Sequence, residues 1–74
     1  MTYYEFLVLM DEQGYLKGLT RCCMPSQHLL YMEIYRHHLA HPKESQLHVS
    51  IRFNRSKKYV YNAYRCMNQL FMPG

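Results

Sequence analysis

The segment that decides the fold class reads KKYVYNAYRCMNQLF, from Lys57 to Phe71. Its tyrosines and valine have good β propensity, so it could pair with the residues before it as a hairpin. The apolar residues recur at i, i+3, i+4, i+7, i+10 and i+11, namely Val60, Ala63, Tyr64, Met67, Leu70 and Phe71. This spacing makes a narrow stripe along a helix. We therefore expect a helix over residues 57–71, stopped by Pro73-Gly74.

The stretch before this helix has a different period. Leu47-His48-Val49-Ser50-Ile51-Arg52-Phe53 alternates apolar and polar residues, which is typical of a strand with one buried face. Asn54-Arg55-Ser56 then reads as a polar turn, and Ser56 is placed to cap the following helix.

The N-terminal third reads as a β-hairpin. Residues 3–10 and 15–22 are rich in aromatic, aliphatic and β-branched side chains, and Asp11-Glu12-Gln13-Gly14 separates them. Gly14 can supply the positive φ that a short connection needs.

A second helix is expected from Ser26, as its N-cap, to about Ala40, with Pro42 ending it. At about 100° per residue, one side of this helix gathers Tyr31, Met32, Ile34, Tyr35, His38 and Leu39, while Glu33, Arg36 and His37 lie on the other. The predicted order is therefore ββαβα. We expect an α+β fold, with an antiparallel sheet and both helices packed on one face, as a single domain over residues 1–74.

Composition narrows the class of protein. The longest apolar run, Phe6 to Met10, is far shorter than the roughly 20 residues of a membrane span, and the N-terminus lacks the basic region of a secretory signal. Cys22, Cys23 and Cys66 are an odd number, which favours reduced thiols buried as small apolar residues. We expect a cytoplasmic protein with no membrane association.

Positive charge is concentrated in the second half of the chain. Residues 34–74 hold seven Lys or Arg and one carboxylate, Glu44. The predicted last helix and the turn before it carry the residue types that contact phosphates and base edges. The candidate nucleic-acid-binding residues are Arg52, Arg55, Lys57, Lys58, Tyr61, Asn62, Arg65 and Gln69. An ordinary solvated helix face is also polar, but it usually mixes Glu with Lys.

Catalysis and metal binding have little support in the sequence. The five acids are scattered, and the glycines do not cluster into a phosphate loop, so we expect no catalytic site and no cofactor. His37 and His41 have the i, i+4 spacing of metal ligands, yet the chain has no Cys-x-x-Cys pair. Solvated histidines at a helix C-terminus are the favoured interpretation, and we expect no metal.

The eight tyrosines support a second hypothesis. A core this small cannot bury all of them, so Tyr3, Tyr15 and Tyr59 are candidates for a protein interface. The leading hypothesis is a small non-enzymatic protein that binds DNA or RNA. The alternative is an adaptor or inhibitor, of the kind that phages and mobile elements encode, that docks on an acidic surface of a host or defence protein complex. A homodimer is compatible with either.

Overall fold

The computed structural model describes residues 1–22 and 25–71, and the side chains of residues 1–19 and 25–71. Five helices follow one another along these residues: α1 (Tyr3–Glu12), α2 (Leu16–Cys22), α3 (Gln27–Ala40), α4 (Gln46–Arg52) and α5 (Lys57–Asn68). The only β pairing in the described residues is an isolated bridge between Thr2 and Leu70. The predicted α+β fold with an antiparallel sheet is therefore wrong, because the described residues form an all-helical fold without a sheet.

The predicted N-terminal hairpin is replaced by α1 and α2. Helix α1 begins with a capping box: the Thr2 hydroxyl accepts a hydrogen bond from the Glu5 amide at 3.1 Å, and the Glu5 carboxylate accepts one from the Thr2 amide at 2.8 Å. Both bonds satisfy amides that a helix start leaves without partners, so local capping overrides the β propensity of the aromatic residues. Gly14 has the predicted positive φ, 78°, but it turns the chain between two helices.

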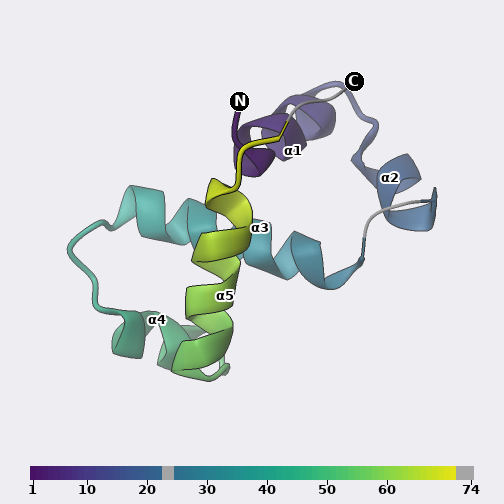
Figure 1. Ribbon diagram of the computed structural model, residues 1–74. Coiled ribbons are helices and arrows are strands. Elements are labelled where there is room, and N and C mark those ends of the chain that lie inside the picture. Colours follow the sequence, from purple (N-terminus) through teal and green to yellow (C-terminus); the bar gives the residue numbers. More distant parts are fainter. Residues whose placement is uncertain (23–24, 72–74) are drawn as a thin grey trace.

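Helix α3 confirms the predicted helix that ends at Ala40, and it crosses the middle of the molecule (Figure 1). Tyr31, Met32 and Ile34 are buried in the core, whereas Leu39 from the predicted stripe is 52% exposed. Ser26 makes no side-chain cap, because its backbone is already in the helical region and its hydroxyl accepts no bond from the first turn.

The predicted strand over residues 47–53 is helix α4. The Ser45 hydroxyl caps it by accepting a hydrogen bond from the His48 amide at 3.2 Å. The helix buries Val49 and Ser50, while Leu47 and Ile51 lie on the side away from the core. The alternation of residue types was read as a strand pattern, but this helix places a serine inside and two aliphatic residues outside.

Helix α5 confirms the predicted helix from Lys57, and Ser56 caps it as expected by accepting a hydrogen bond from the Tyr59 amide at 3.1 Å. It ends at Asn68, earlier than predicted, and Leu70 beyond it is 86% exposed. It packs across α3 and against α4, and its far end lies beside α1 (Figure 1). The shared core consists of Leu7, Tyr31, Met32, Ile34, Val49, Val60, Ala63 and Met67.

Backbone hydrogen bonds tie α1 to the end of α5. The Tyr3 amide donates to the Gln69 carbonyl and the Phe71 amide donates to the Met1 carbonyl, both at 2.8 Å. Helix α1 therefore lies at the opposite end of α5 from α4 (Figure 1). None of the helices in the described part of the chain has the length and apolar character of a membrane span.

Candidate nucleic-acid interface

Helices α4 and α5 are joined by a tight turn over residues 53–56. Asn54 takes the left-handed conformation, with φ of 55°, which asparagine tolerates better than most residues. The Asn54 amide donates to the Ile51 carbonyl at 3.1 Å, and the Arg55 amide donates to the Ser50 carbonyl at 2.9 Å. These bonds satisfy the end of α4 and fix the direction in which α5 departs.

Small and apolar side chains hold the two helices together. Ser50 is 4% exposed, and its hydroxyl donates to the Leu47 carbonyl at 2.7 Å, so its polar atom has a partner inside the core. Val49 on α4 and Val60 on α5 are fully buried in the same core. The turn and this packing join α4 and α5 as a helix-turn-helix arrangement.

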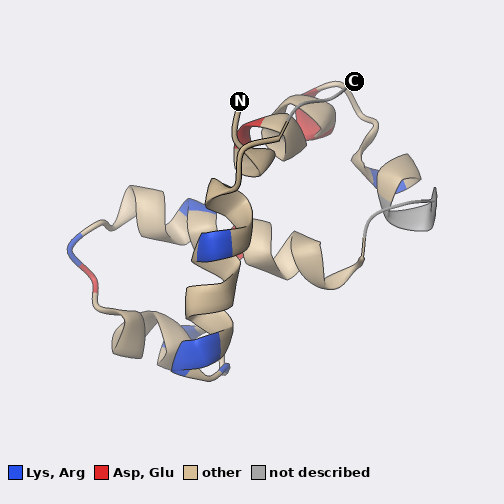
Figure 2. Ribbon diagram, in the orientation of Figure 1, with Lys and Arg blue, Asp and Glu red and all other residues tan. Residues whose placement is uncertain are grey.

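The face of α5 that points away from the core is basic and polar. Val60, Ala63 and Met67 on its inner side are all fully buried. The predicted binding residues on this helix that lie in exposed positions are Lys57, Lys58, Tyr61, Asn62 and Arg65. Lysine and arginine gather where α5 begins, while acidic residues gather on α1 at the other end of the molecule (Figure 2). Helix α5 carries no carboxylate.

Arg55 extends this basic face onto the turn. Its guanidinium carbon lies 5.3 Å from the centre of the Tyr59 ring, a cation–π contact that restricts the side chain. Tyr59 is in turn packed edge-on against Tyr31, with ring centres 5.1 Å apart. The turn therefore holds one arginine in a defined position beside the start of α5.

Two of the predicted binding residues do not join this face. The Arg52 Nε lies 3.4 Å from a Glu44 carboxylate oxygen, whose second oxygen lies 3.0 Å from the His37 Nε2. The hydrogen bond with His37 is the main cause that lowers the pKa of Glu44 below its ordinary value. This charged cluster fastens the α3–α4 connection to α4. Gln69 lies beyond the end of α5, where its carbonyl accepts the bond from Tyr3.

Two of the three tyrosines predicted to form an interface are linked through other rings, because Tyr3 packs against His28, which stacks on Tyr31, which packs against Tyr59. The Tyr3 hydroxyl is hydrogen-bonded with the His28 Nδ1 at 2.9 Å, and Tyr59 packs between Tyr31 and Arg55. Tyr15 is 62% exposed, at the turn between α1 and α2. Tyr3 and Tyr59 therefore belong to one series of ring contacts, and their role in an interface stays a prediction.

The two histidines predicted at metal-ligand spacing, His37 and His41, lie close together, with ring centres 4.6 Å apart. Within the described residues, no group of three His, Cys, Asp or Glu side chains is arranged to hold an ion. Cys66 is partly buried near His28, with 3.9 Å from Sγ to Nε2, and burial raises the pKa of its thiol. The prediction that Cys22 and Cys23 are buried falls outside the described side chains.

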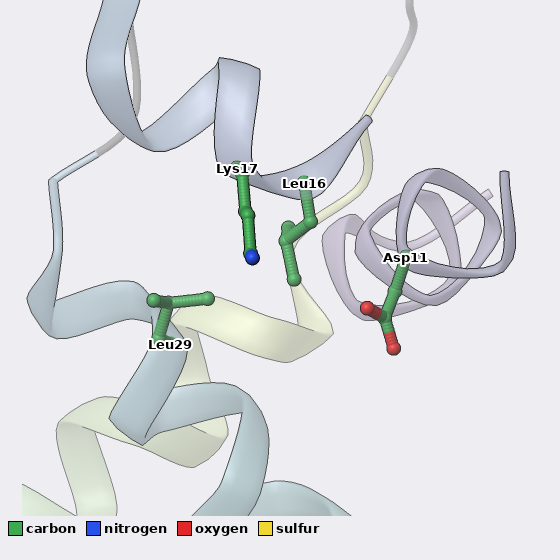
Figure 3. Close-up of a pocket in the computed structure, with 4 residues that line it drawn as sticks. All are labelled: Asp11, Leu16, Lys17 and Leu29. Atoms are coloured by element: carbon green, nitrogen blue, oxygen red, sulfur yellow. The ribbon is translucent and has the colours of Figure 1, made fainter. Parts of the chain in front are cut away.

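A separate hollow of about 240 Å³ lies between the end of α1, the start of α2 and the first turn of α3 (Figure 3). Leu16 and Leu29 line it together with Asp11 and Lys17. Its lining is mostly apolar and comes from the half of the chain that does not form the basic face.

The sequence predicts the Ser56 cap and the turn at Asn54, but its strand pattern obscures the cap of α4 at Ser45. Ser45 and Ser56 each precede a helix as N-cap, and the segment between them is short enough for one helix and one turn. Asn54 lies where the chain must adopt a positive φ. Comparisons with protein-family models, curated protein sequences and solved structures found no match to this chain.

Proposed function

We propose that this protein binds duplex DNA by placing α5 in the major groove. The observation that carries the proposal is the carboxylate-free, basic outer face of α5, a helix whose inner face is buried against α3 and α4. A helix of 12 residues is about 18 Å long, and the major groove of B-form DNA, about 12 Å wide, admits a helix. In helix-turn-helix proteins, the second helix of the pair lies in that groove.

The exposed residues at and near α5 are suited to two kinds of contact, and Lys58 can take part in both. Lys57 and Lys58 in the first turn, with Arg55 before them, are suited to phosphate oxygens on the two sides of the groove. Lys58, Tyr61, Asn62 and Arg65 stand at i, i+3, i+4 and i+7 and form one stripe along the helix. Asparagine can pair with adenine and arginine with guanine, so the stripe can read base edges as well as phosphates.

Duplex DNA is favoured over duplex RNA because the major groove of A-form RNA is too deep and narrow for side chains on a helix to read. Glu44 does not oppose phosphate binding, since its carboxylate is already held by His37 and Arg52. Arg52 is engaged in the same cluster, so we count four phosphate contacts: Arg55, Lys57, Lys58 and Arg65.

Fluorescence anisotropy with labelled duplexes at a series of salt concentrations tests the proposal. Each phosphate contact contributes about −0.9 to the log–log slope of affinity against salt, so four contacts predict a slope of about −3.6. Lys58→Ala and Arg65→Ala should each make the slope shallower by about one. Arg36→Gln on α3, which removes the same charge away from α5, is the matched control and should leave the slope unchanged.

A separate experiment tests whether α5 recognises the base sequence of the DNA. Asn62→Ala should reduce discrimination between duplexes by the roughly 1–3 kcal/mol of a base contact while leaving the salt slope in place. A folded protein that binds no duplex or single-stranded DNA or RNA at low salt would contradict the proposal. Equal affinity for duplex DNA and duplex RNA would contradict the major-groove geometry.

A further inference from the structure

Arg55 is restrained at both ends of its side chain in the turn between α4 and α5. Its backbone amide donates to the Ser50 carbonyl at 2.9 Å, which fixes its backbone at the end of α4. Its guanidinium carbon lies 5.3 Å from the centre of the Tyr59 ring, within the usual range of a cation–π contact. The charged end of a long and intrinsically flexible side chain therefore also has a defined neighbour.

The Tyr59 ring is itself anchored to the core. The Tyr59 backbone amide donates to the Ser56 hydroxyl at 3.1 Å, which places this residue in the capped first turn of α5. Its ring packs edge-on against Tyr31, which is only 9% exposed and belongs to the core cluster. Tyr59 therefore offers Arg55 a surface whose position is set by both α3 and α5.

The contact with Tyr59 leaves the charge of Arg55 available to a ligand. Among the residues that the structure describes, no carboxylate forms an ion pair with Arg55, whereas Arg52 pairs with Glu44. A ring attracts a guanidinium without supplying an acceptor oxygen, so the N–H fork that matches two phosphate oxygens keeps its donors. Arg55 is thus restrained by a neutral group and still has its full positive charge to offer.

Restraint before binding strengthens binding. A flexible side chain that becomes immobilised in a complex loses rotamer freedom, which weakens association by about two- to twelvefold for each such side chain. A side chain that is already ordered in the free protein avoids most of this loss. Within the described part of the chain, Arg55 is the one Lys or Arg of the proposed binding face with a ring contact of this kind.

We infer that Tyr59 is a positioning residue for DNA binding, because it holds the Arg55 guanidinium where a backbone phosphate can meet it. This inference rests on the proposed binding of duplex DNA by α5. Tyr59 acts through Arg55 and needs no contact of its own with the DNA. Its ring, rather than its hydroxyl, carries this role, since the cation–π contact is made with the ring.

Fluorescence anisotropy with a labelled DNA duplex at a series of salt concentrations tests the role of Tyr59. Tyr59→Leu removes the aromatic ring and should weaken binding by about two- to twelvefold. Tyr59→Phe keeps the ring and should bind as tightly as the wild-type protein. Arg55→Ala removes the phosphate contact itself, so it should make the log–log slope of affinity against salt shallower by about 0.9.

A double-mutant cycle separates positioning from a general structural effect. In the Arg55→Ala background, Tyr59→Leu should cause no further loss of affinity, because the side chain that it positions is absent. Tyr35→Leu is the matched control, since Tyr35 is another partly buried tyrosine that packs on the core and touches α5 through the Tyr64 ring. It should leave DNA affinity unchanged. Circular dichroism verifies that all variants are folded in the assay.

Three results would overturn the inference while leaving duplex binding by α5 in place. The first is wild-type affinity in Tyr59→Leu, and the second is an equal loss from Tyr59→Leu with and without Arg55. The third is an unchanged salt slope in Arg55→Ala, which would show that Arg55 meets no phosphate. A wild-type protein that binds no nucleic acid at low salt would instead contradict the proposed function and this inference together.

Discussion

Replacing Met67 by alanine should strongly destabilise the fold. Met67 lies on the inner face of α5, is fully buried, and belongs to the core shared by α1, α3, α4 and α5. The change removes three heavy atoms, which at about 0.8 kcal/mol per buried methylene-sized group corresponds to about 2.4 kcal/mol of lost transfer free energy. Part of the resulting cavity will not collapse, so we expect a total loss of about 2–4 kcal/mol.

This loss is large for a chain of 74 residues, whose unfolding free energy should be about 4–11 kcal/mol. Urea unfolding followed by circular dichroism measures it, and the melting temperature should fall by about 8–30 °C. Met67→Leu, which nearly conserves volume, should cost less than about 1.5 kcal/mol. Ile51→Ala, at a residue 68% exposed, should change stability by about 0.5 kcal/mol or less. A loss below about 1 kcal/mol for Met67→Ala would refute the assigned core.

Three further predictions concern the turn, the charged cluster and metal binding. Because Asn54 has a φ of 55°, Asn54→Ala should cost about 1 kcal/mol in urea unfolding, whereas Asn54→Gly should be tolerated; equal effects would contradict the left-handed turn. The lowered pKa of Glu44 stabilises the fold above its ordinary value of 4.5, and this stabilisation is lost as the pH falls through the lowered pKa. Glu44→Gln should therefore flatten the acid side of the stability–pH curve, and an unchanged curve would argue against the His37 contact. A strong chelator should leave the circular dichroism spectrum unchanged, whereas unfolding that zinc reverses would revive a metal site at His37 and His41.

The sequence predicted α3 and α5 because their apolar residues recur at helical spacing over three or more turns. The sequence also identified most of the exposed basic and polar residues of α5, but not how α4 lies beside them. It did not predict α4, because Leu47 and Ile51 face outward and Ser50 faces inward, which reverses the usual pattern of an amphipathic helix.

Helix α1 was missed for a different reason. The Thr2 and Glu5 pair is a capping-box signature, but the aromatic and β-branched residues that follow favoured a strand. The position of Arg52 could not be predicted either, since its contact with Glu44 depends on how the α3–α4 connection folds back. Local capping decided the structure of α1, whereas a tertiary contact decided the position of Arg52.

Helix α5 carries its core residues and its proposed binding residues on separate positions. Val60, Ala63 and Met67 are buried, while Tyr61, Asn62 and Arg65 are exposed, and no residue belongs to both sets. Mutations on the outer side should therefore accumulate without loss of folding, so the proposed binding face can change over generations at nearly constant stability. A library that randomises only the outer positions should consist mostly of folded proteins, which makes this helix a convenient starting point for selecting new binding specificities.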